Sequence, residues 1–344
     1  MTVNGMGSYV STDGHVVEPA DLWTTRMDKR FRDRAPRVEP RPDADYYIID
    51  GLSPFPVGLE GATMEDKIAG EITSVVGRRH GETRPGAWDP RARLVDQDMN
   101  HLKAEVIYPG LFDLQLWTTP DVACQRKCWR VYNDGLSEFC AAAPGRPIGA
   151  GFLPMKGPIE WAVEEAQRIA KKPGLSPISI HSGASTGEPF AARFERMGMG
   201  IIDTKISLPM RALGDVIWSA VPQRFPKLKF MIVEGGIGWI ASVLRLMDHW
   251  WIDHHRWMEP NLDEAPCTYF KRQFWATFED DRAGILTREL LGVDRPMWGS
   301  DYPHTAGTFP HSQEQITRDF MGAPESEVYQ MVVGNAASLY GLDV

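Results

Sequence analysis

The sequence of 344 residues contains no uninterrupted apolar stretch of about 18 residues, which is the length that a membrane-spanning helix needs. Its most apolar stretch, Leu228–Leu246, is broken by Glu234 and by further polar or glycine positions. The N-terminus has no basic start followed by an apolar core, so we expect no secretory signal. These absences predict a cytoplasmic protein that neither spans nor binds a membrane.

Cysteine is scarce, with four residues in the whole chain: Cys124, Cys128, Cys140 and Cys267. Two of them are four positions apart in a helical-looking segment, which differs from the C-x-x-C spacing of zinc and redox motifs. We therefore expect ordinary thiols, mostly buried, and no disulfide framework.

The sequence also lacks an excess of positive charge, since 37 Lys and Arg face 46 Asp and Glu, for a net charge of −9. This balance argues against a nucleic-acid partner, which needs clustered basic residues. Hydrophobic residues at 43% and charged residues at 24% are typical of a globular protein that can bury a large core. The net charge says little about small substrates, because a local positive centre such as a metal ion can overrule it.

No sequence repeat of fixed period is visible, but short apolar runs alternate with longer amphipathic ones. The predicted strands are Tyr9–Thr12, Glu105–Tyr108, Pro147–Leu153, Ile178–His181, Lys229–Val233, Phe274–Phe278 and Pro296–Gly299. The predicted helices are Pro120–Ala143, Ile159–Lys172, Met210–Arg224, Trp239–His254, Ala283–Leu291 and Gln313–Phe320. Strands that alternate with helices predict parallel pairing, and this chain length fits an α/β protein with a TIM-type (β/α) barrel.

Two segments do not follow this alternation. The stretch Arg30–Pro90 is rich in Pro, Gly and charge, and contains an extended piece, Tyr46–Asp50, that ends at Gly51. We interpret it as a long insertion after the first strand, either a lid or subunit contact or else a solvated loop. In the tail, Pro324–Val344, the sequence predicts a short helix capped by Gly341. We expect the whole chain, residues 1–344, to form one domain that contains the insertion.

Polar side chains stand at the ends of several predicted strands. Asp13 and His15 follow the first strand, His181 ends the fourth, Glu234 the fifth and Asp301 the last. In a barrel the carboxyl ends of all strands meet at one face, where active sites are built. Carboxylates and imidazoles are ordinary ligands of zinc and other divalent metals.

Each of the three motifs that carry these residues has a plainer alternative when it is considered alone. Asp13-Gly14-His15 is a short pattern, although alternate residues of a strand point to the same side. His181, between Ile180 and Ser182, suits a core histidine, and Asp301 suits a turn or helix cap. Their order along the chain and their place at strand ends favour one shared metal site.

In this order the motifs resemble the amidohydrolase superfamily, in the amidohydrolase-related branch that contains aminocarboxymuconate-semialdehyde decarboxylase and the resorcylate and carboxyvanillate decarboxylases. The resemblance covers nearly the whole chain. It rests on Asp13-Gly14-His15 with Glu18-Pro19, Arg224–Lys229, Glu234–Trp239 and Gly299–His304.

The resemblance implies a (β/α)₈ barrel, one divalent metal (zinc by default, manganese as an alternative), and a homodimer. It also implies that the metal ligands are Asp13, His15, His181 and Asp301. Asp301 would accept or relay a proton, while Glu234 and His304 would assist the chemistry or position the substrate.

The chain departs from that branch at Glu234, where the characterised decarboxylases carry a histidine. Glu234 has three possible roles: acid/base work if burial raises its pKa, substrate binding, or orientation of His181 as a carboxylate behind the ligand. A second departure lies between the helix that ends near Lys172 and the strand at Ile178, where we find no room for the strand and helix that the branch normally has. Either one strand is hidden in a segment that we interpret as a loop, or the barrel lacks one βα unit and is shortened and open. The segment Ile201–Ser207 is a possible extended piece, though out of place.

Other features carry less weight. Gly235-Gly236-Ile237-Gly238 matches neither the dinucleotide nor the Walker pattern and predicts a tight strand-to-helix turn. Glu18 is expected to form an ion pair or cap in the first loop, and a direct role is possible. A Trp-rich and His-rich cluster favours packing or a dimer interface over a second metal site; it comprises Trp250, Trp251, His254, His255 and Trp257.

The function predicted from these residues is metal-dependent hydrolysis or decarboxylation of a small, aromatic or unsaturated, carboxylated molecule. Hydrolysis and decarboxylation stay open as alternatives. A non-catalytic binding or scaffold relative, inactive because of the missing unit, is the hypothesis from a different class.

Overall fold

The computed structural model describes residues 7–60, 78–110, 112, 116–117, 119–179, 202–257, 259 and 261–344. The chain forms two compact units. Unit 1 comprises Met1–Thr12, Met197–Gly299 and Gln313–Val344, and unit 2 comprises Asp13–Arg196 and Ser300–Ser312.

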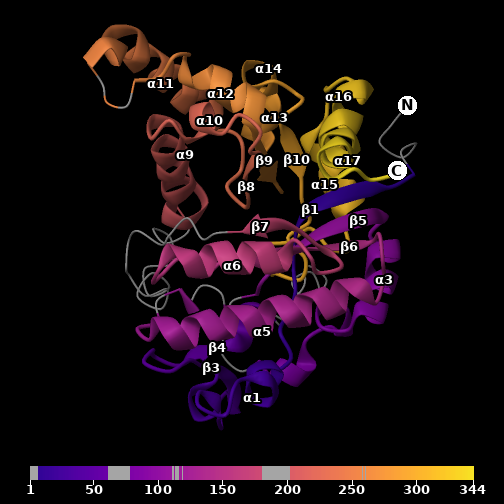
Figure 1. The fold of residues 1–344 in the computed structure, drawn as a ribbon. Helices are drawn as coiled ribbons and strands as arrows, with labels where there is room; N and C mark the ends of the chain where they lie inside the picture. The colour runs from indigo at the N-terminus through magenta and orange to yellow at the C-terminus, as the bar shows by residue number, and fades with distance from the viewer. Residues whose placement is uncertain are drawn as a thin grey trace. The chain divides into compact units, whose positions relative to one another are not determined.

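The main sheet of unit 2 has the strand order β1-β5-β6-β7. Its strands are β1 (Tyr9–His15, which begins in unit 1), β5 (Leu102–Tyr108), β6 (Pro147–Phe152) and β7 (Leu175–Ser179). β6 pairs in parallel with both β5 and β7. The helices between these strands, α5 (Val122–Ala141) and α6 (Ile159–Ile169), lie side by side along the sheet, as crossover connections require (Figure 1).

Helix α5 shows why these residues adopt this local structure. Its N-cap, Asp121, accepts hydrogen bonds from the backbone N–H groups of Ala123 and Cys124. Apolar residues at helical spacing, among them Cys128 and Trp129, form its buried face. Cys140 and the two other cysteines of this helix are buried free thiols, and Cys267 is a half-buried one, as the sequence predicts.

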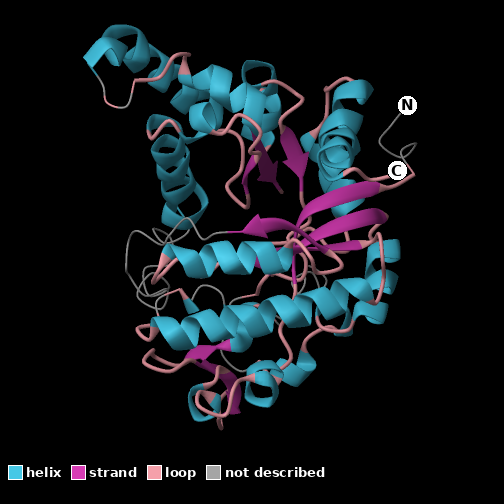
Figure 2. Cartoon of the chain, in the orientation of Figure 1, coloured by secondary structure: helices cyan, strands magenta, loops and turns pink. Residues whose placement is uncertain are grey.

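The predicted insertion contains a small antiparallel sheet of its own, drawn in Figure 2. The strands are β2 (Arg37–Pro40), β3 (Asp45–Ile48) and β4 (Phe55–Pro56), and the short helix α1 (Leu22–Arg26) precedes them. Tyr47 and Phe55 are buried in the same core cluster as residues of α5, so this part of the insertion is not a solvated loop. Helix α3 (Pro90–Met99) follows it and leads into β5.

Unit 1 holds a parallel sheet of order β10-β9-β8. The strands are β8 (Phe230–Ile232), β9 (Phe274–Phe278) and β10 (Pro296–Trp298). The helices are α9 (Leu208–Trp218), α10 (Val221–Arg224), α11 (Ile240–His254), α12 (Pro266–Gln273), α13 (Arg282–Leu286), α14 (Arg288–Leu291), α15 (Ser312–Asp319, whose first residue is counted with unit 2), α16 (Glu325–Tyr329) and α17 (Asn335–Tyr340). α17 ends at Gly341 in the left-handed conformation, which confirms the predicted cap.

All seven predicted strands are present, with some displaced ends. The fourth, β7, begins at Leu175 and so follows α6 directly, without a further strand or helix in Ala170–Gly174, as expected from the short connection. Ile180 and the residues that follow it up to 201 lie outside the described part of the chain. The extended piece expected at Ile201–Ser207 is wrong: Asp203–Ser207 are helical and continue into α9, whose first turn accommodates Pro209.

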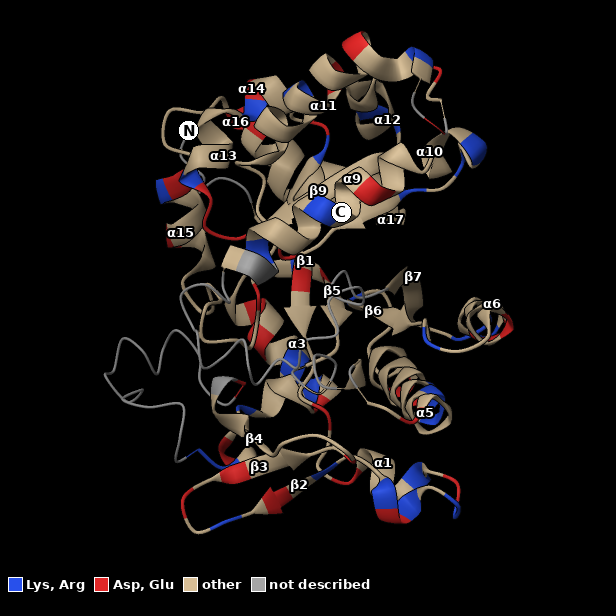
Figure 3. Ribbon diagram, turned by 90° about the vertical axis from the view of Figure 1, so that its left-hand side faces the viewer, with Lys and Arg blue, Asp and Glu red and all other residues tan. Residues whose placement is uncertain are grey.

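The surface charge follows the composition. Lys and Arg are interspersed with Asp and Glu over the outer helices α5 and α6 (Figure 3). Among the residues that the structure describes, no helix combines the length and apolar character needed to span a bilayer.

Candidate metal centre

The carboxyl end of β1 and the loop Ser300–His304 meet in unit 2. The backbone N–H of Asp301 donates to the carbonyl of Asp13 (2.7 Å), and the N–H of His15 donates to the carbonyl of Tyr302 (2.6 Å). Gly14 and Tyr302 form a parallel bridge between the two segments. This pairing brings together residues that are almost 300 positions apart in the chain.

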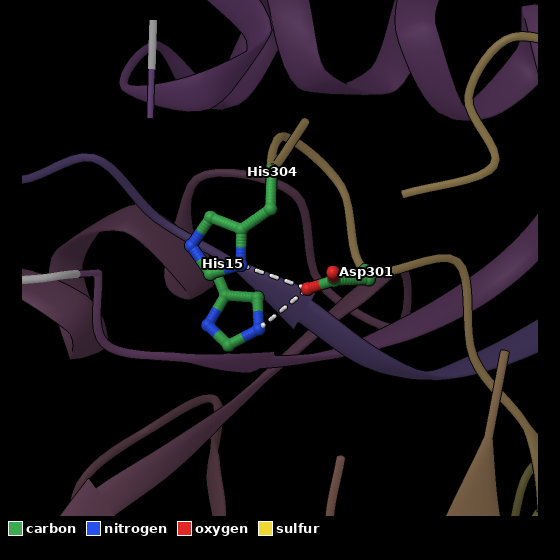
Figure 4. Close-up of side chains that lie close together, drawn as sticks. All are labelled: His15, Asp301 and His304. Carbon is green, nitrogen blue, oxygen red and sulfur yellow. Dashed lines mark hydrogen bonds and ion pairs between the residues drawn. The ribbon is translucent and has the colours of Figure 1, made fainter. Parts of the chain in front are cut away.

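Three side chains form the centre of this site, as Figure 4 shows. Asp301 Oδ1 lies 3.2 Å from His15 Nε2 and accepts a 2.8 Å hydrogen bond from His304 Nδ1. The rings of His15 and His304 stack with their centroids 4.0 Å apart. Each residue offers a ligand atom, and these atoms all lie within 4.8 Å of one another, a spacing suited to one metal ion.

Asp13 adds a second carboxylate, with its Oδ1 3.4 Å from His15 Nε2. Asp13, His15 and Asp301 are all buried, with at most 5% of each residue exposed. Burial alone would lower the pKa of His15, but the neighbouring Asp13 and Asp301 carboxylates raise it well above its usual value. The pocket is therefore strongly electronegative and stabilises a cation, whether a proton or a metal ion.

The tautomer of His15 suits metal binding. Its Nδ1 lies 2.8 Å from the carbonyl oxygen of Pro109, which can only accept, so Nδ1 carries the hydrogen. Nε2 then presents its lone pair toward Asp13 and Asp301 once the ring is neutral. Metal-binding histidines are commonly fixed in this way by a carbonyl behind the ring.

The structure thus places Asp13, His15, Asp301 and His304 together, and His181 lies outside the described residues. Glu18 is buried and its Oε1 accepts a hydrogen bond from the backbone N–H of Gly110, which follows β5 and lies outside the first loop in which the sequence suggested an ion pair or cap.

Glu234 belongs to unit 1, where it follows β8 and forms a charged cluster. Lys205 Nζ lies 2.8 Å from Glu234 Oε1 and 3.2 Å from the carboxylate of Glu279, which follows β9. The Glu234 N–H donates to Thr277 Oγ1 at 2.8 Å, and the backbone adopts a positive φ of 60°. One third of the Glu234 side chain is exposed, so the burial on which the acid/base interpretation depended is only partial.

Two residues of unit 1 escaped the sequence motifs. Lys205 belongs to no recognisable pattern. Asp281 is the other, and its carboxylate accepts hydrogen bonds from the N–H groups of Ile237 and Gly238 at 2.7 and 2.8 Å. The glycine-rich turn thus has a protein carboxylate at its N–H groups, which agrees with a tight turn rather than a phosphate loop.

The predicted aromatic cluster of unit 1 is confirmed as a set of neighbouring rings. Trp250 and His254 have ring centroids 4.6 Å apart, and Trp251 stacks on His255 at 4.8 Å. Trp257 meets His254 edge-on and is 74% exposed.

The chain matches the family model described as amidohydrolase over residues 21–342. The match includes Asp301 and His304 and begins after Asp13 and His15. No curated protein sequence matches the chain.

Solved structures share the fold over almost the full length. An amidohydrolase from Mycobacterium avium subsp. paratuberculosis K-10 superposes with a TM-score of 0.74 at 19% identity, covering 96% of this chain and 98% of that chain. 5-Carboxyvanillate decarboxylase from Sphingomonas paucimobilis gives 0.61 at 19% identity, with 98% and 100% covered. A manganese-bound mutant of 5-carboxyvanillate decarboxylase from Novosphingobium aromaticivorans DSM 12444 gives 0.65 at 16%, with 97% of each covered.

At these identities the structures are informative about the fold, which is the TIM-type α/β fold, and the family match covers most of the sequence. The match and the polar side chains at the strand ends together confirm the resemblance inferred from the motifs. The chain belongs to the amidohydrolase family.

Proposed function

We propose that this chain is a metal-dependent enzyme that decarboxylates or hydrolyses a small carboxylated molecule, with one divalent ion held by Asp13, His15, His181 and Asp301. The observation that carries the proposal is the cluster at the end of β1, in which the buried Asp13, His15 and Asp301 lie beside the half-buried His304. Carboxylates and imidazoles are common ligands of divalent metal ions, so this cluster is suited to bind one.

Manganese and zinc are both compatible with these ligands. Zinc is the ordinary expectation for mixed imidazole and carboxylate ligands, while two carboxylates also suit the harder manganese ion. The manganese bound to the Novosphingobium relative supports testing manganese beside zinc.

A divalent ion at this site would polarise a substrate oxygen or lower the pKa of a bound water. Asp301 accepts or relays a proton at its carboxylate, and His304 orients that carboxylate through its Nδ1 hydrogen bond. His304 Nε2 has no hydrogen-bond partner among the residues that the structure describes, which makes it a suitable proton-transfer atom.

The substrate that we propose is an aromatic or unsaturated carboxylic acid. Two of the decarboxylases among the similar structures act on 5-carboxyvanillate, an aromatic acid, and this favours decarboxylation over hydrolysis. The comparisons offer no support for the non-catalytic alternative.

In unit 1 we propose that Glu234 acts as a carboxylate held by Lys205, in place of the histidine of the known decarboxylases. An ammonium 2.8 Å away pairs with the Glu234 carboxylate and fixes its position. A carboxylate held in this way is suited to bind a polar group of the substrate.

The experiment is a substrate panel offered to the protein loaded with manganese or with zinc. One arm contains hydroxybenzoates and methoxyhydroxybenzoates, and the other contains esters, amides and lactones. We expect release of CO₂ from the first arm without hydrolytic products. Hydrolysis without CO₂ release would select the other reaction, and inactivity of the metal-loaded protein on both arms would contradict the proposal.

We also propose that the protein is a cytoplasmic homodimer without a nucleic-acid partner. Helix α11 supports a protein interface, because Leu246, Trp250 and Ile252 are each more than half exposed. Light scattering after size-exclusion chromatography measures the assembly directly. A mass of about 38.6 kDa, that of one chain, would contradict the dimer.

A further inference from the structure

A second set of polar residues lies directly behind the metal centre in unit 2. Arg93 and Gln97 stand on one face of α3, and both donate to the same oxygen, Oε2 of Glu105 on β5, at 2.8 and 2.9 Å. The side chains of Arg93 and Glu105 are at most 1% exposed. Removing both charges from water costs free energy, so a fully buried ion pair adds little net stability by itself. The other contacts of Arg93 and Glu105 indicate a further role.

Arg93 touches the metal-binding strand itself. Its Nη1 donates to the carbonyl oxygen of His15 at 2.9 Å and to that of Gly86 at 3.2 Å. The same guanidinium binds Glu105 through Nε. This planar group therefore connects α3 with β5 and with the backbone of His15, a proposed metal ligand.

Glu105 reaches the same strand from the other direction. A Cβ built on Gly14 would lie 2.2 Å from Glu105 Oε1, so the carboxylate is packed against the backbone between Asp13 and His15. The middle residue of the Asp-Gly-His motif is therefore a glycine because Glu105 occupies the space of a side chain.

The loop that carries Asp301 is held by the same helix. The guanidinium of Arg93 lies 4.3 Å from the ring centroid of Tyr302, whose hydroxyl donates to Asp96 Oδ2 at 2.6 Å. Arg84 forms two hydrogen bonds with the Asp96 carboxylate, at 3.0 and 2.8 Å. One face of α3 thus contacts the two described segments that supply proposed ligands, the end of β1 and the loop that carries Asp301.

We propose that Arg93, with Glu105 as its counter-ion, is a positioning residue of the metal centre. It binds the backbone carbonyl of His15 and packs on Tyr302, so that His15 Nε2 and the Asp301 carboxylate keep the spacing that a metal ion requires. This inference rests on the proposed metal site.

The test compares Arg93→Lys with Arg288→Lys. Lysine keeps the positive charge but loses the fork that reaches Glu105, His15 and Gly86 together. Arg288 is a matched control in unit 1, because it is also largely buried and paired with a carboxylate, that of Glu327. The readout is the Kd for Mn²⁺, measured by titration calorimetry on protein that circular dichroism shows to be folded.

We expect Arg93→Lys to bind Mn²⁺ about 10- to 100-fold more weakly than the wild type, as is typical when a residue that supports a ligand is changed. Arg288→Lys should keep the wild-type Kd. A merely structural role for Arg93 would lower the melting temperature of the metal-free protein and leave the Kd of the folded protein unchanged, which would overturn the inference.

If Arg93→Lys does not fold, Glu105→Gln takes its place, since it removes the charge and keeps the shape. The same weakening is expected, and an unchanged Kd would again overturn the inference. A wild-type protein that binds no Mn²⁺ would contradict the proposed function instead, so the two failures are distinguishable.

Discussion

Two carboxylates of unit 2, Asp13 and Asp301, are buried beside imidazoles, whereas two carboxylates of unit 1, Glu234 and Glu279, are partly exposed beside an ammonium. Asp13 and Asp301 lie 3.4 and 3.2 Å from His15 Nε2, and at most 1% of either is exposed. Glu234 and Glu279 lie 2.8 and 3.2 Å from Lys205 Nζ, with 33% and 14% of their side chains exposed.

This difference indicates what each unit contributes. An imidazole that gives up its proton becomes a metal ligand, so the cluster of unit 2 can exchange a proton for a metal ion. A lysine ammonium has no acceptor and competes with a metal ion for the same carboxylates. Unit 2 is therefore suited to hold a metal ion, whereas Lys205 already pairs with the carboxylates of unit 1.

The largest effect that we predict is a loss of activity when the cluster of unit 2 is disrupted. Asp301→Asn keeps the shape and removes both a ligand charge and the proton acceptor, so kcat/KM should fall about a thousandfold or more. Steady-state kinetics with the substrate found in the panel measures this loss. Full turnover by the variant would rule out the proposed mechanism.

The matching changes in unit 1 are Glu234→Gln and Lys205→Met, which separate its two charges. We predict that each lowers kcat/KM about a hundredfold. Neither should change the Kd for Mn²⁺, because no metal is assigned to this cluster. A loss of Mn²⁺ binding in either variant would remove the distinction between the units.

A third pair of variants compares two glycines. Gly14→Ala places a Cβ 2.2 Å from Glu105 Oε1 and should destabilise unit 2 by about 1–3 kcal/mol. Gly214→Ala, within α9 of unit 1, has its nearest neighbour 4.0 Å away and should stabilise by about 0.5–1 kcal/mol. Calorimetric melting of the two variants should show shifts of opposite sign, and equal shifts would argue against the packing of Glu105 on Gly14.

A fourth pair of variants compares the helix caps of the two units. Asp281 accepts hydrogen bonds from Ile237, Gly238 and Gly284, so Asp281→Ala should cost about 2 kcal/mol. Asp121 accepts from two backbone N–H groups of α5, so Asp121→Ala should cost about 1 kcal/mol. Urea unfolding of both variants measures the two losses in free energy of unfolding. A larger loss in Asp121→Ala than in Asp281→Ala would contradict the prediction.

The effect of Asp121 should also depend on pH. The N–H of Cys124, and then the Arg34 guanidinium, lower the pKa of Asp121. The ionised Asp121 therefore stabilises the folded protein fully above the pKa of an unfolded aspartate, about 3.9. This stabilisation is lost as the pH falls through the lower pKa of Asp121 in the folded protein. The difference in melting temperature between wild type and Asp121→Ala should be constant from about pH 5 to 8 and narrow only below that range.

The sequence predicted the alternation of strands and helices well, because buried strands and amphipathic helices leave strong local patterns. It also placed Asp13, His15 and Asp301 together, since residues at the carboxyl ends of parallel strands meet at one face. The insertion was harder. Its sheet is stabilised by contacts such as that of Tyr47 with Phe112, which no local pattern reveals.

The residues behind the site were missed for a similar reason. Asp89-Pro90 is a helix start signal that would have located α3, with Asp89 as its N-cap and proline in the first turn. Even so, the contact of Arg93 with His15 joins residues 78 positions apart, and Lys205 meets two glutamates from separate strands. Such pairings depend on the tertiary fold rather than on any motif.

The most direct test of the account is a calorimetric titration of Mn²⁺ into the metal-free wild type, His15→Ala and Glu234→Gln. We predict one bound ion per chain in the wild type and in Glu234→Gln, and binding at least a hundredfold weaker in His15→Ala. Equal binding by the wild type and His15→Ala, or no binding by the wild type, would contradict a metal centre at the end of β1.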